Sequence, residues 1–449
     1  MDTQRKKGGN LVAILTMFAL YALAGFVTFL AAPAGDLWKY QLPGGSNVLG
    51  MLGGSMNFVA YLILGWPAGK MLQNWGYKTT AILSTGVGTV GVLIQMASGH
   101  LDFGTVGSLE IPGAWFVYLF GVLVSGFSMC LINTVVNPML NTIVGGGNKG
   151  NQLNLGGSAL NSLSGAIAPV ILGGIVGKIT KDTQFASIDN VLLSAAIVFF
   201  VATVIIAFLP ISNPVQRAKG IVYERSPLAF RHCRLGVLAI FLYLGVEIGI
   251  QNHMRLWLAP DNASSPLLSY GIDVASAATI AGSTAFMLMI LILVGRLVGA
   301  AIGGKVSSRN MLLGCAGSGV LLTVAGALLG HFKPELSVTM PLFTSLTSVK
   351  MSQIPLAALF FMLTGLSMSV MWGGIFNLAT EGLGKYTEQA SGMFMVMVFG
   401  GAPLPVLQSW VFDKVGPMAS FIISVICFAY IFFFALAGSK NVNKDIKID

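Results

Sequence analysis

Long apolar runs follow one another along most of this sequence, each long enough to cross the ~30 Å hydrocarbon layer of a membrane. Hydrophobic residues make up 55% of the 449 residues and charged residues only 9%, with a mean hydropathy of +0.80. A water-soluble domain cannot bury so much apolar surface, so the composition indicates an integral membrane protein. The sequence predicts twelve spans, in two sets of six, at 11–32, 48–66, 80–97, 114–140, 155–176, 191–209, 235–258, 274–302, 312–330, 354–378, 393–410 and 419–437.

The first apolar run has flanks that also occur in secretory signal peptides, because basic residues precede it and the small-residue stretch AAPAG follows it. The run from Leu11 is too long for the apolar core of a signal peptide, so we interpret it as an uncleaved helix. No disulfide framework is predicted, because the four cysteines fall inside spans or in a basic central segment. They are Cys130, Cys233, Cys315 and Cys427.

The net charge of +9 follows a topological pattern and does not indicate a nucleic-acid partner. If the spans alternate in direction, most basic residues fall on one side: Arg5, Lys6, Lys7, Lys70, Lys78, Lys149, Arg217, Lys219, Arg225, Arg231, Arg234, Lys305, Arg309, Lys385, Lys440, Lys444 and Lys447. The other side receives Lys39, Lys178, Lys181, Arg255, Lys333, Lys350 and Lys414. Since basic residues accumulate in cytoplasmic loops, both termini are predicted to be cytoplasmic.

A polar, basic stretch near the middle of the chain predicts its division into two halves. The stretch is QRAKGIVYERSPLAFRHCR, and it gives an N-terminal six-helix half at 1–215, a cytoplasmic linker at 216–234 and a C-terminal six-helix half at 235–449. A faint repeat supports the division, since GWPAGKMLQNWGYKTTAIL follows the second span and GAAIGGKVSSRNMLLG follows the eighth. Repeats of this kind are typical of transporters whose binding site lies at the membrane midplane between the halves.

Two neighbouring spans carry a ladder of amides on either side of a glycine turn. A carboxamide costs roughly 4 to 8 kcal/mol to move into hydrocarbon, so the amides should avoid lipid. One interpretation is that they hold helices together, which is worth ~0.6 kcal/mol for each polar contact in a membrane. The other is that they line a wetted substrate pathway, and the number of amides favours it. They are Asn133, Asn137, Asn141, Gln152, Asn154 and Asn161.

Several stretches match the motifs of one known family. In the first half they are PAGKMLQNWGYK with Tyr61 before it, NPM at 137–139, and QLNLGGSALNSLSG. In the second half they are FLYLGVEIGI, GRLVGA, IFNLATEGLG and SGMFMVMVFGGAPLPVLQSWVFDKVG. On these motifs the chain resembles the major facilitator superfamily and, within it, the fucose permease-like sugar/proton symporters. The resemblance covers essentially all spans and implies an all-α membrane protein of twelve transmembrane helices in two pseudo-symmetric six-helix bundles.

A neutral sugar needs donors and acceptors for its hydroxyls and a flat apolar surface for its ring, which amides and aromatic residues supply. Trp372 lies where similar carriers place an aromatic residue in their tenth helix, so it is the candidate for stacking on the sugar, with simple packing as the alternative. The predicted substrate-binding residues are Asn133, Asn137, Asn154, Asn161, Gln251, Asn252, Asn377 and Trp372. Asn57 and Gln95 are interpreted as structural.

Glu247 is an acid in the middle of the seventh span, where a charge costs roughly 2.5 to 3.5 kcal/mol. Gln251 and Arg255 follow at four-residue steps and therefore share a helical face with it. A carboxyl group at this depth could carry a proton through a transport cycle. The alternative is a structural acid, paired with Arg255 or used in helix packing.

Four further residues are predicted to act in gating. Arg296 lies toward the cytoplasmic third of the eighth span, where it could reach an acid or a helix end. Glu381 and Asp413 lie at span ends, as latches or caps, and Lys78 belongs to the motif that follows the second span. His253 points away from the Glu247 face and is expected to be packed or interfacial.

Departures from the family bear on ion coupling. Fucose permease-like carriers have an aspartate in the first helix before a proline, whereas this chain has Phe29 before Pro33. The fourth-helix acid or glutamine of the family is Asn133 here, and an arginine and a glutamine of the fifth helix become Gln152 and Gly157. Coupling therefore falls to a proton on Glu247, to sodium held by amide and carbonyl oxygens, or to neither, in a uniporter.

The sequence predicts a secondary transporter of a sugar or amino sugar in a bacterial-type inner membrane, working as a monomer without a cofactor. One alternative is a carrier with the same fold for a nucleoside, peptide or organic anion, and an anion would require Arg255 or Arg296 in the cavity. The other alternative is a receptor that binds without transport. Enzyme motifs are not indicated, since GGGNKG lacks the strand and the Lys-Ser/Thr of a phosphate-binding loop. The four histidines are widely scattered, so no metal site is predicted.

Overall fold

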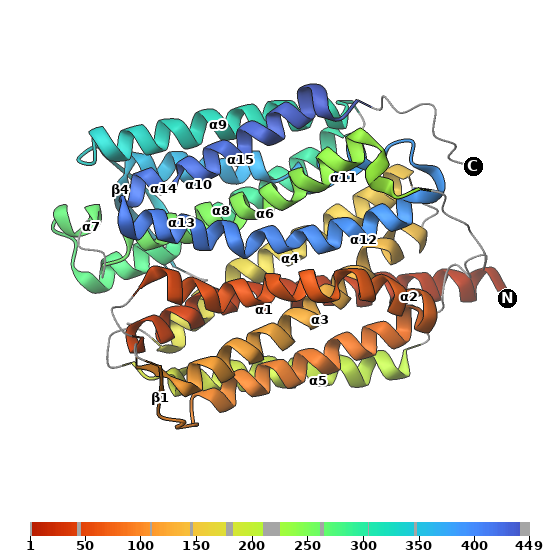
Figure 1. Cartoon of the computed structure of the whole chain (residues 1–449), viewed down its shortest axis with the longest axis horizontal. Coiled ribbons are helices and arrows are strands. Elements are labelled where there is room, and N and C mark those ends of the chain that lie inside the picture. Colours follow the sequence, from red (N-terminus) through yellow and green to blue (C-terminus); the bar gives the residue numbers. More distant parts are fainter. Residues whose placement is uncertain are drawn as a thin grey trace.

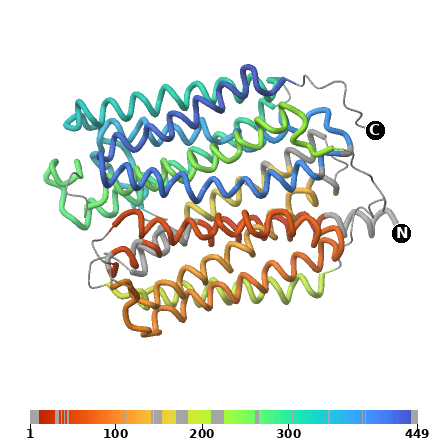
Figure 2. Tube along the Cα trace, viewed as in Figure 1, coloured from red at the N-terminus to blue at the C-terminus, as the bar shows by residue number. Residues whose placement is uncertain are grey.

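The computed structural model describes residues 2–42, 46–107, 110–143, 147–176, 183–209, 225–260, 265–303, 305–344 and 348–440. Figure 2 traces the path of the chain through these segments. Most of the predicted junction between the halves, 210–224, falls outside them, so the boundaries at 215 and 234 stay predictions. The side chains of Phe29, Pro33, Asn141 and Gln152 also lie outside the described part of the structure.

Five α-helices make up the described part of the first half, and α2 contains two of the predicted spans. As one straight rod its 52 residues would measure about 78 Å, more than twice the hydrocarbon thickness. Gly76 interrupts it with φ 77° and ψ 175°, a backbone conformation that favours glycine, and the ribbon doubles back there (Figure 1). The elements are α1 (Asp2–Gln41), α2 (Asn47–Ser98), α3 (Gly113–Ile143), α4 (Gly147–Val176), η2 (Phe185–Ile188) and α5 (Asp189–Phe208).

The helices of the second half are more often broken into consecutive segments. The last three predicted spans are each built from two or three pieces, namely α10 with α11, α12 with η5 and α13, and α14 with α15 and η6. The elements are η3 (Pro227–Ala229), α6 (Arg231–Leu258), α7 (Pro266–Ser269), α8 (Val274–Ile302), α9 (Ser308–Phe332), α10 (Leu356–Met368), α11 (Met371–Thr380), η4 (Gly384–Tyr386), α12 (Thr387–Met397), η5 (Val398–Gly401), α13 (Pro403–Lys414), α14 (Pro417–Ser420), α15 (Ile422–Phe433) and η6 (Phe434–Gly438).

The twelve predicted spans correspond to helices of the structure. Ten helical segments of the described residues are long and apolar enough to cross a membrane. One of these is α2, which counts as two spans, and α4 supplies the remaining one. In Figure 1, α1–α5 occupy one part of the molecule and α6–η6 the other, as two bundles side by side. Large apolar side chains cover the outside, including Phe208 at 85% exposure and Leu321 at 72%, as lipid contact requires.

The two bundles meet along two seams. Helix α4 packs against α8, and α2 packs against α12, η5 and α13. Gly400 permits a close approach beside the second seam, because a Cβ atom there would lie 1.9 Å from the carbonyl oxygen of Phe241 on α6. A Cβ atom on the neighbouring Gly401 would likewise lie 2.7 Å from the ring of Phe58 on α2. The glycines in the second-half motif therefore let η5 wedge between the bundles.

Two short β-hairpins stand at one end of the bundles, which we call the hairpin end (left in Figure 1). We call the opposite end, where α1 begins and η6 ends, the terminal end. Strands β1 (Thr105–Val106) and β2 (Ile111–Pro112) form one hairpin, and β3 (Ser337–Phe343) and β4 (Val349–Pro355) form the other. Neither hairpin was predicted from the sequence. The larger hairpin is fixed to α8 by a 2.6 Å hydrogen bond from the Ser283 hydroxyl to the Phe343 carbonyl.

Candidate substrate site

The amides of α3 form a hydrogen-bonded chain with tyrosines from α1 and α2. The side-chain nitrogen of Asn133 donates to the Tyr61 hydroxyl at 2.6 Å, and that of Asn137 donates to the Asn133 carbonyl at 2.9 Å. The Tyr21 hydroxyl in turn donates to Oδ1 of Asn137 at 2.5 Å. Both tyrosines are buried and both asparagines half-buried. Each of these amides therefore makes at least one hydrogen bond inside the first bundle.

Helix α4 joins the same network through two more of the predicted amides. Asn154 donates to the Asn137 carbonyl at 3.2 Å, and Asn161 donates to the Tyr21 carbonyl at 3.0 Å. The ring of Tyr21 fits against Gly157, where a Cβ atom would approach it to 2.3 Å. Side-chain oxygen Oδ1 of Asn154 is buried without a hydrogen-bond partner in the described structure. The network thus keeps at least one acceptor unused.

Arg296 connects this network to the second bundle. From α8 its guanidinium reaches across to α4, donating to the Ser158 carbonyl at 2.6 Å and to the Ser162 hydroxyl at 2.5 Å. Its other terminal nitrogen lies 3.4 Å from Oε1 of Glu247 on α6. The Tyr21 hydroxyl is within electrostatic range of the same guanidinium. Arg296 is only 8% exposed. Its contacts with Glu247 and α4 are compatible with the predicted gating role, which stays a prediction.

Glu247 is therefore an acid paired across the second bundle. Its partner is Arg296, not Arg255, which the sequence analysis had offered as a partner. Arg255 lies two helical turns further along α6, about 12 Å away. Gln251, one turn beyond Glu247, is buried at 6% exposure. The shared face predicted for α6 thus holds the charged pair near the midplane and Arg255 near the hairpin end.

Two aromatic rings adjoin the charged pair from the second bundle. Tyr243 and Trp372, on α6 and α11, have ring centroids 6.4 Å apart at an angle of 53°. The Tyr243 hydroxyl is buried beside both Glu247 and Arg296. Trp372 itself is half-buried, as is Asn377 on the same helix. The structure therefore places the predicted stacking residue beside the ring of Tyr243, whereas no described hydrogen bond ties Asn377 to this group.

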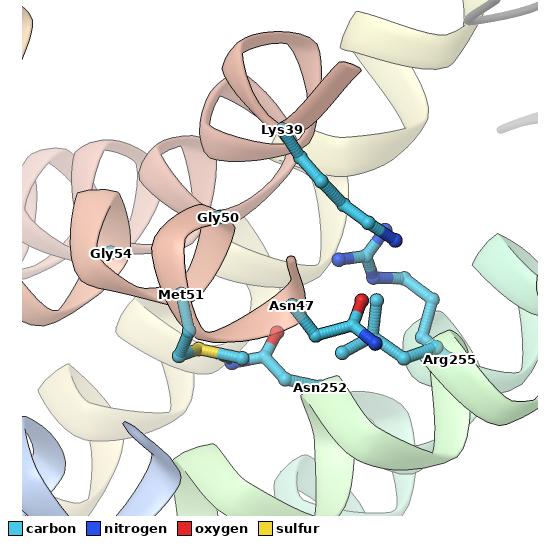
Figure 3. A pocket seen from close by; sticks show the side chains of 8 residues that line it. Lys39, Asn47, Gly50, Met51, Gly54, Asn252 and Arg255 are labelled. Carbon is cyan, nitrogen blue, oxygen red and sulfur yellow. Dashed lines mark hydrogen bonds between the residues drawn. The ribbon is translucent and has the colours of Figure 1, made fainter. Parts of the chain in front are cut away.

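Asn252 belongs to a different place, a small pocket between the bundles at the hairpin end (Figure 3). Its side-chain nitrogen faces the Met51 sulfur at 3.9 Å instead of the amide network. Figure 3 shows the ends of the Lys39 and Arg255 side chains together beside this pocket. Its lining residues are Lys39, Asn47, Gly50, Met51, Gly54, Asn252, Arg255 and Leu256. Adjacent positions 251 and 252 thus face different surroundings, because neighbours on a helix differ in direction by about 100°.

The predicted gating residues divide into two kinds. Arg296 and Asp413 bridge the bundles, the latter accepting a 2.6 Å hydrogen bond at Oδ1 from Asn47 of α2. Lys78 lies just past the turn at Gly76, and Glu381 ends α11 with an exposed side chain. The described contact of Glu381 is within its own bundle, where its backbone carbonyl lies 3.0 Å from the His232 ring. Gating roles for these residues stay predictions.

His253 and the cysteines lie apart from the candidate site. The His253 ring is packed between the Gly249 carbonyl at 2.8 Å and the Ser409 hydroxyl at 2.9 Å, as expected for a histidine facing away from Glu247. All four cysteines are free. Over the described ranges, no three His, Cys, Asp or Glu side chains gather as a metal site would require.

Tyr21 and Tyr243 are the site residues that the sequence analysis missed. Each lies in an apolar run, where a tyrosine resembles an ordinary packing residue. A signal was present for Tyr243, because it precedes Glu247 by four positions and extends the face on which Gln251 and Arg255 lie. Tyr21 offered no such signal, since its partners come from α3 and α4.

Comparison with known proteins agrees with this architecture. No family model matches the chain. The glucose/galactose transporter of Brucella abortus is 28% identical over 395 residues, which cover 86% of this chain and 84% of the relative. The crystal structure of FucP, a major facilitator superfamily transporter in the outward conformation, matches with a TM-score of 0.67 at 17% identity, covering 96% of this chain and 98% of FucP.

The nucleoside transporter NupG, solved as a mutant, is also similar in structure. Its TM-score is 0.59 at 14% identity, over 95% of this chain and 98% of NupG. These likenesses show that the chain has the major facilitator fold, a multi-pass all-α membrane architecture, and confirm the predicted resemblance. The relative and the two structures are transporters, which confirms the prediction that the chain is not an enzyme.

Proposed function

We propose that this protein is a sugar transporter that works by alternating access of one site between the two bundles, and that a proton on Glu247 drives it. One observation carries the proposal. Tyr21 links amides of α3 and α4, and Arg296 joins the same helix α4, through Ser158 and Ser162, to Glu247 at the junction of the bundles. Such a path at the junction is what a carrier needs, because both bundles must touch the solute.

The cargo is proposed to be a neutral monosaccharide. Asparagine side chains offer a donor and an acceptor each, which suits hydroxyl groups, and Trp372 offers a flat ring near the charged pair. The name of the Brucella relative supports glucose or galactose as the first sugars to test. An organic anion is less well supported, because Arg296 is already engaged by Glu247, Ser158 and Ser162.

In the proposed cycle, Arg296 ties α8 to α4 in one state and must release α4 as the bundles rock. The sugar, bound between Asn133, Asn154 and Asn161 on one side and Gln251, Trp372 and Asn377 on the other, would supply the hydrogen bonds that compensate for this release. Without a bound sugar, the hydrogen bonds lost by Arg296 would not be replaced, so movement of the bundles would be less favourable. Binding and movement would then be linked by the limited supply of polar partners in the interior.

Protonation of Glu247 would neutralise the counter-charge of Arg296. A buried guanidinium without its acid is costly, so the protonated state would favour movement of Arg296 away from α6. One charge crossing 100 mV is worth about 2.3 kcal/mol, which supports roughly fiftyfold accumulation of a neutral solute. A single titrating carboxyl group is therefore sufficient for uphill uptake.

The setting of the carrier is part of the proposal. We infer that the terminal end faces the cytoplasm of a bacterial-type inner membrane, following the distribution of basic residues, and that a monomer suffices. Asp413 with Asn47 would then help close the outer side, and Lys78, Glu381 and Arg296 would act on the inner side.

Uptake into proteoliposomes tests the proposal. We expect labelled D-glucose or D-galactose to accumulate when the outside is made acidic, and L-glucose to be excluded. Glu247→Gln should abolish accumulation while leaving exchange of sugar for sugar, since exchange needs no net proton movement. Uptake that depends on neither the pH gradient nor Glu247 would leave a uniporter, if sugar only equilibrates, or a sodium-coupled carrier, if sugar accumulates in a sodium gradient. Failure of every monosaccharide, with success of a nucleoside, peptide or organic anion, would reject the sugar assignment.

A further inference from the structure

Asn57 and Gln95 are two buried amides of α2 with different surroundings. From the sequence both were interpreted as structural. The structure supports this for Gln95, because its side-chain nitrogen donates to the Ser125 hydroxyl at 2.8 Å. Asn57 is at least as deeply buried, at 1% exposure against 4%, yet neither its Oδ1 nor its Nδ2 has a hydrogen-bond partner among the described residues. Helix packing therefore explains the amide of Gln95 but not that of Asn57.

A buried amide with both ends unpaired is costly, because the donor and the acceptor each lose a hydrogen bond that water gave them in the unfolded chain. The neighbouring helix does not offer a side chain at the point of closest approach. Gly126 of α3 lies there, and a Cβ atom on it would stand 2.6 Å from the Asn57 carbonyl oxygen. Proteins retain such unfavourable groups chiefly at functional sites. Asn57 therefore has a donor and an acceptor for a partner from outside the chain.

The position of Asn57 is next to the amide network of the candidate substrate site. Tyr61 follows it by one turn of α2, so the two side chains lie on one face. Side chains on a helix lean toward its N-terminus, which directs the Tyr61 ring toward the turn that carries Asn57. The Tyr61 hydroxyl accepts a hydrogen bond from Asn133 at 2.6 Å, and its own hydrogen remains for another acceptor. Asn57 thus extends the polar face of Asn133 and Tyr61 toward the hairpin end.

At the level of Asn57, helix α2 also borders the second bundle. The Ser55 hydroxyl lies 3.4 Å from the carbonyl oxygen of Ala402, which precedes α13. The ring of Phe58 packs against Gly401 of η5, so closely that a Cβ atom on that glycine would lie 2.7 Å from it. Asn57 therefore lies at the junction of the bundles, where a carrier must hold its solute.

Resting on the sugar transport proposed above, we propose that Asn57 binds two adjacent hydroxyl groups of the transported sugar. One hydroxyl accepts a hydrogen bond from Nδ2 of Asn57, and the next one donates to Oδ1. The sugar then pairs both ends of the buried amide, so the cost of leaving them unpaired is recovered when it binds. The solute-binding surface thereby includes α2 and reaches beyond Asn133 toward the hairpin end.

Asn57→Leu tests this assignment, because it keeps the branched shape of the side chain and removes both polar atoms. Gln95→Met is the matched control, since it also replaces a buried amide of α2. Titration of the unfolding midpoint with the monosaccharide that stabilises wild type measures affinity. We expect Asn57→Leu to weaken binding roughly two- to twelvefold for each hydrogen bond lost. Gln95→Met should lower the midpoint without sugar, because it removes the partner of Ser125, and should leave the affinity unchanged.

Monodeoxy derivatives of the same sugar identify the hydroxyl groups that Asn57 binds. Two derivatives that lack adjacent hydroxyls should each bind wild type roughly two- to twelvefold more weakly than the parent sugar does. Asn57→Leu should bind these two derivatives as well as it binds the parent sugar, because the group that recognised the missing hydroxyls is gone. Gln95→Met should discriminate among the derivatives as wild type does.

Asn57→Ala, which adds no atoms, is the second variant if the methyl groups of leucine do not fit. Unchanged affinity in the variants that fold would overturn the inference and assign the amide to a resident water molecule or to packing. Failure of both variants to fold would overturn it as well, since the amide would then be needed without sugar. A wild type that binds no monosaccharide would instead reject the proposed cargo itself.

Discussion

The backbone carbonyl of Ser158, on α4, accepts a 2.6 Å hydrogen bond from the guanidinium of Arg296, on α8. This contact joins the two bundles through a buried cation, and the same cation is 3.4 Å from Glu247. A backbone carbonyl cannot be removed by mutation, so Arg296 is the part of the link that can be tested. Its replacement affects both the seam between bundles and the charge balance of Glu247.

Arg296→Met should destabilise the protein by roughly 3 to 5 kcal/mol, because it leaves the buried Glu247 carboxylate without a partner. The double variant Glu247→Leu with Arg296→Met should recover much of that loss, since neither charge is then left alone. Unfolding of the purified protein in detergent measures both. Strictly additive effects of the two substitutions would contradict a mutual pairing.

Asn133 offers a way to separate a helix contact from a sugar ligand. Tyr61→Phe and Asn133→Ala each remove the 2.6 Å hydrogen bond between α2 and α3, so each should cost about 0.6 kcal/mol or somewhat more. If Asn133 also binds the solute, only Asn133→Ala should weaken the stabilisation that sugar confers. Equal weakening by both variants would assign Asn133 to packing alone. Titration of the unfolding midpoint with sugar measures the difference.

Hydropathy was sufficient to predict the spans, because crossing a lipid bilayer requires long apolar runs whatever the tertiary structure. Glu247 and Arg296 could likewise be selected, since charges at such depth are rare. Their pairing was not predictable, because it depends on how α6 and α8 approach. Tyr21 was missed for the same reason, because its partners come from α3 and α4. Tyr243 was missed although its four-residue spacing from Glu247 was a usable signal. Asn252 is the opposite case. An amide is a suitable residue type for a sugar site, but the side chain of Asn252 lines the pocket at the hairpin end instead.

The hairpin of β3 and β4 was missed because apolar and polar residues mix in its strands. The last residues of β4, Ile354 and Pro355, are buried. The hydropathy pattern therefore assigned them to the following span, which was predicted to begin at residue 354. The true helix α10 begins at Leu356. Period-two alternation over residues 337–343, with exposed and less exposed side chains in turn, was the signal available in β3.

Asp273 gives a pH-dependent prediction outside the membrane spans. It caps α8, where Oδ1 accepts backbone hydrogen bonds from Ala275 and Ser276, both at 3.0 Å. A hydrogen bond from the Ser276 side chain, followed by the one from its backbone, lowers the pKa of Asp273. A lowered folded-state pKa adds stability above the ordinary aspartate value of about 4, and this contribution is lost as the pH falls through the lowered pKa.

We therefore expect the unfolding midpoint of wild type to exceed that of Asp273→Ala at neutral pH, and the gap to narrow under acid. Asp273→Asn is the matched control, because a neutral amide still accepts the capping hydrogen bonds. Its difference from Asp273→Ala should hardly change with pH. A wild-type advantage that persists well below about pH 3 would show that the charge of Asp273 plays no part.

Gly400 should tolerate no side chain. A Cβ atom there would stand 1.9 Å from the Phe241 carbonyl oxygen, so Gly400→Ala requires η5 and α6 to move apart. Overpacking of this kind costs roughly 1 to 3 kcal/mol or more. Gly282→Ala, in α8, is the control, because a Cβ atom there meets nothing within 4 Å. Equal unfolding midpoints for the two variants would mean that η5 does not wedge against α6 as described.

Asp413 and Asn47 link the bundles at the hairpin end, and loss of this link should let that end open more often. One hydrogen bond of about 0.5 to 1.5 kcal/mol corresponds to roughly a two- to twelvefold change in the open population. A cysteine at position 252, 8% exposed as asparagine and lining the neighbouring pocket, reports opening through its reaction with a thiol reagent that does not cross membranes. Asp413→Ala should speed that reaction by such a factor. Lys414→Ala, which shortens the next exposed side chain, should leave the rate unchanged. Equal rates in wild type and Asp413→Ala would show that the carboxylate of Asp413 does not hold the bundles together.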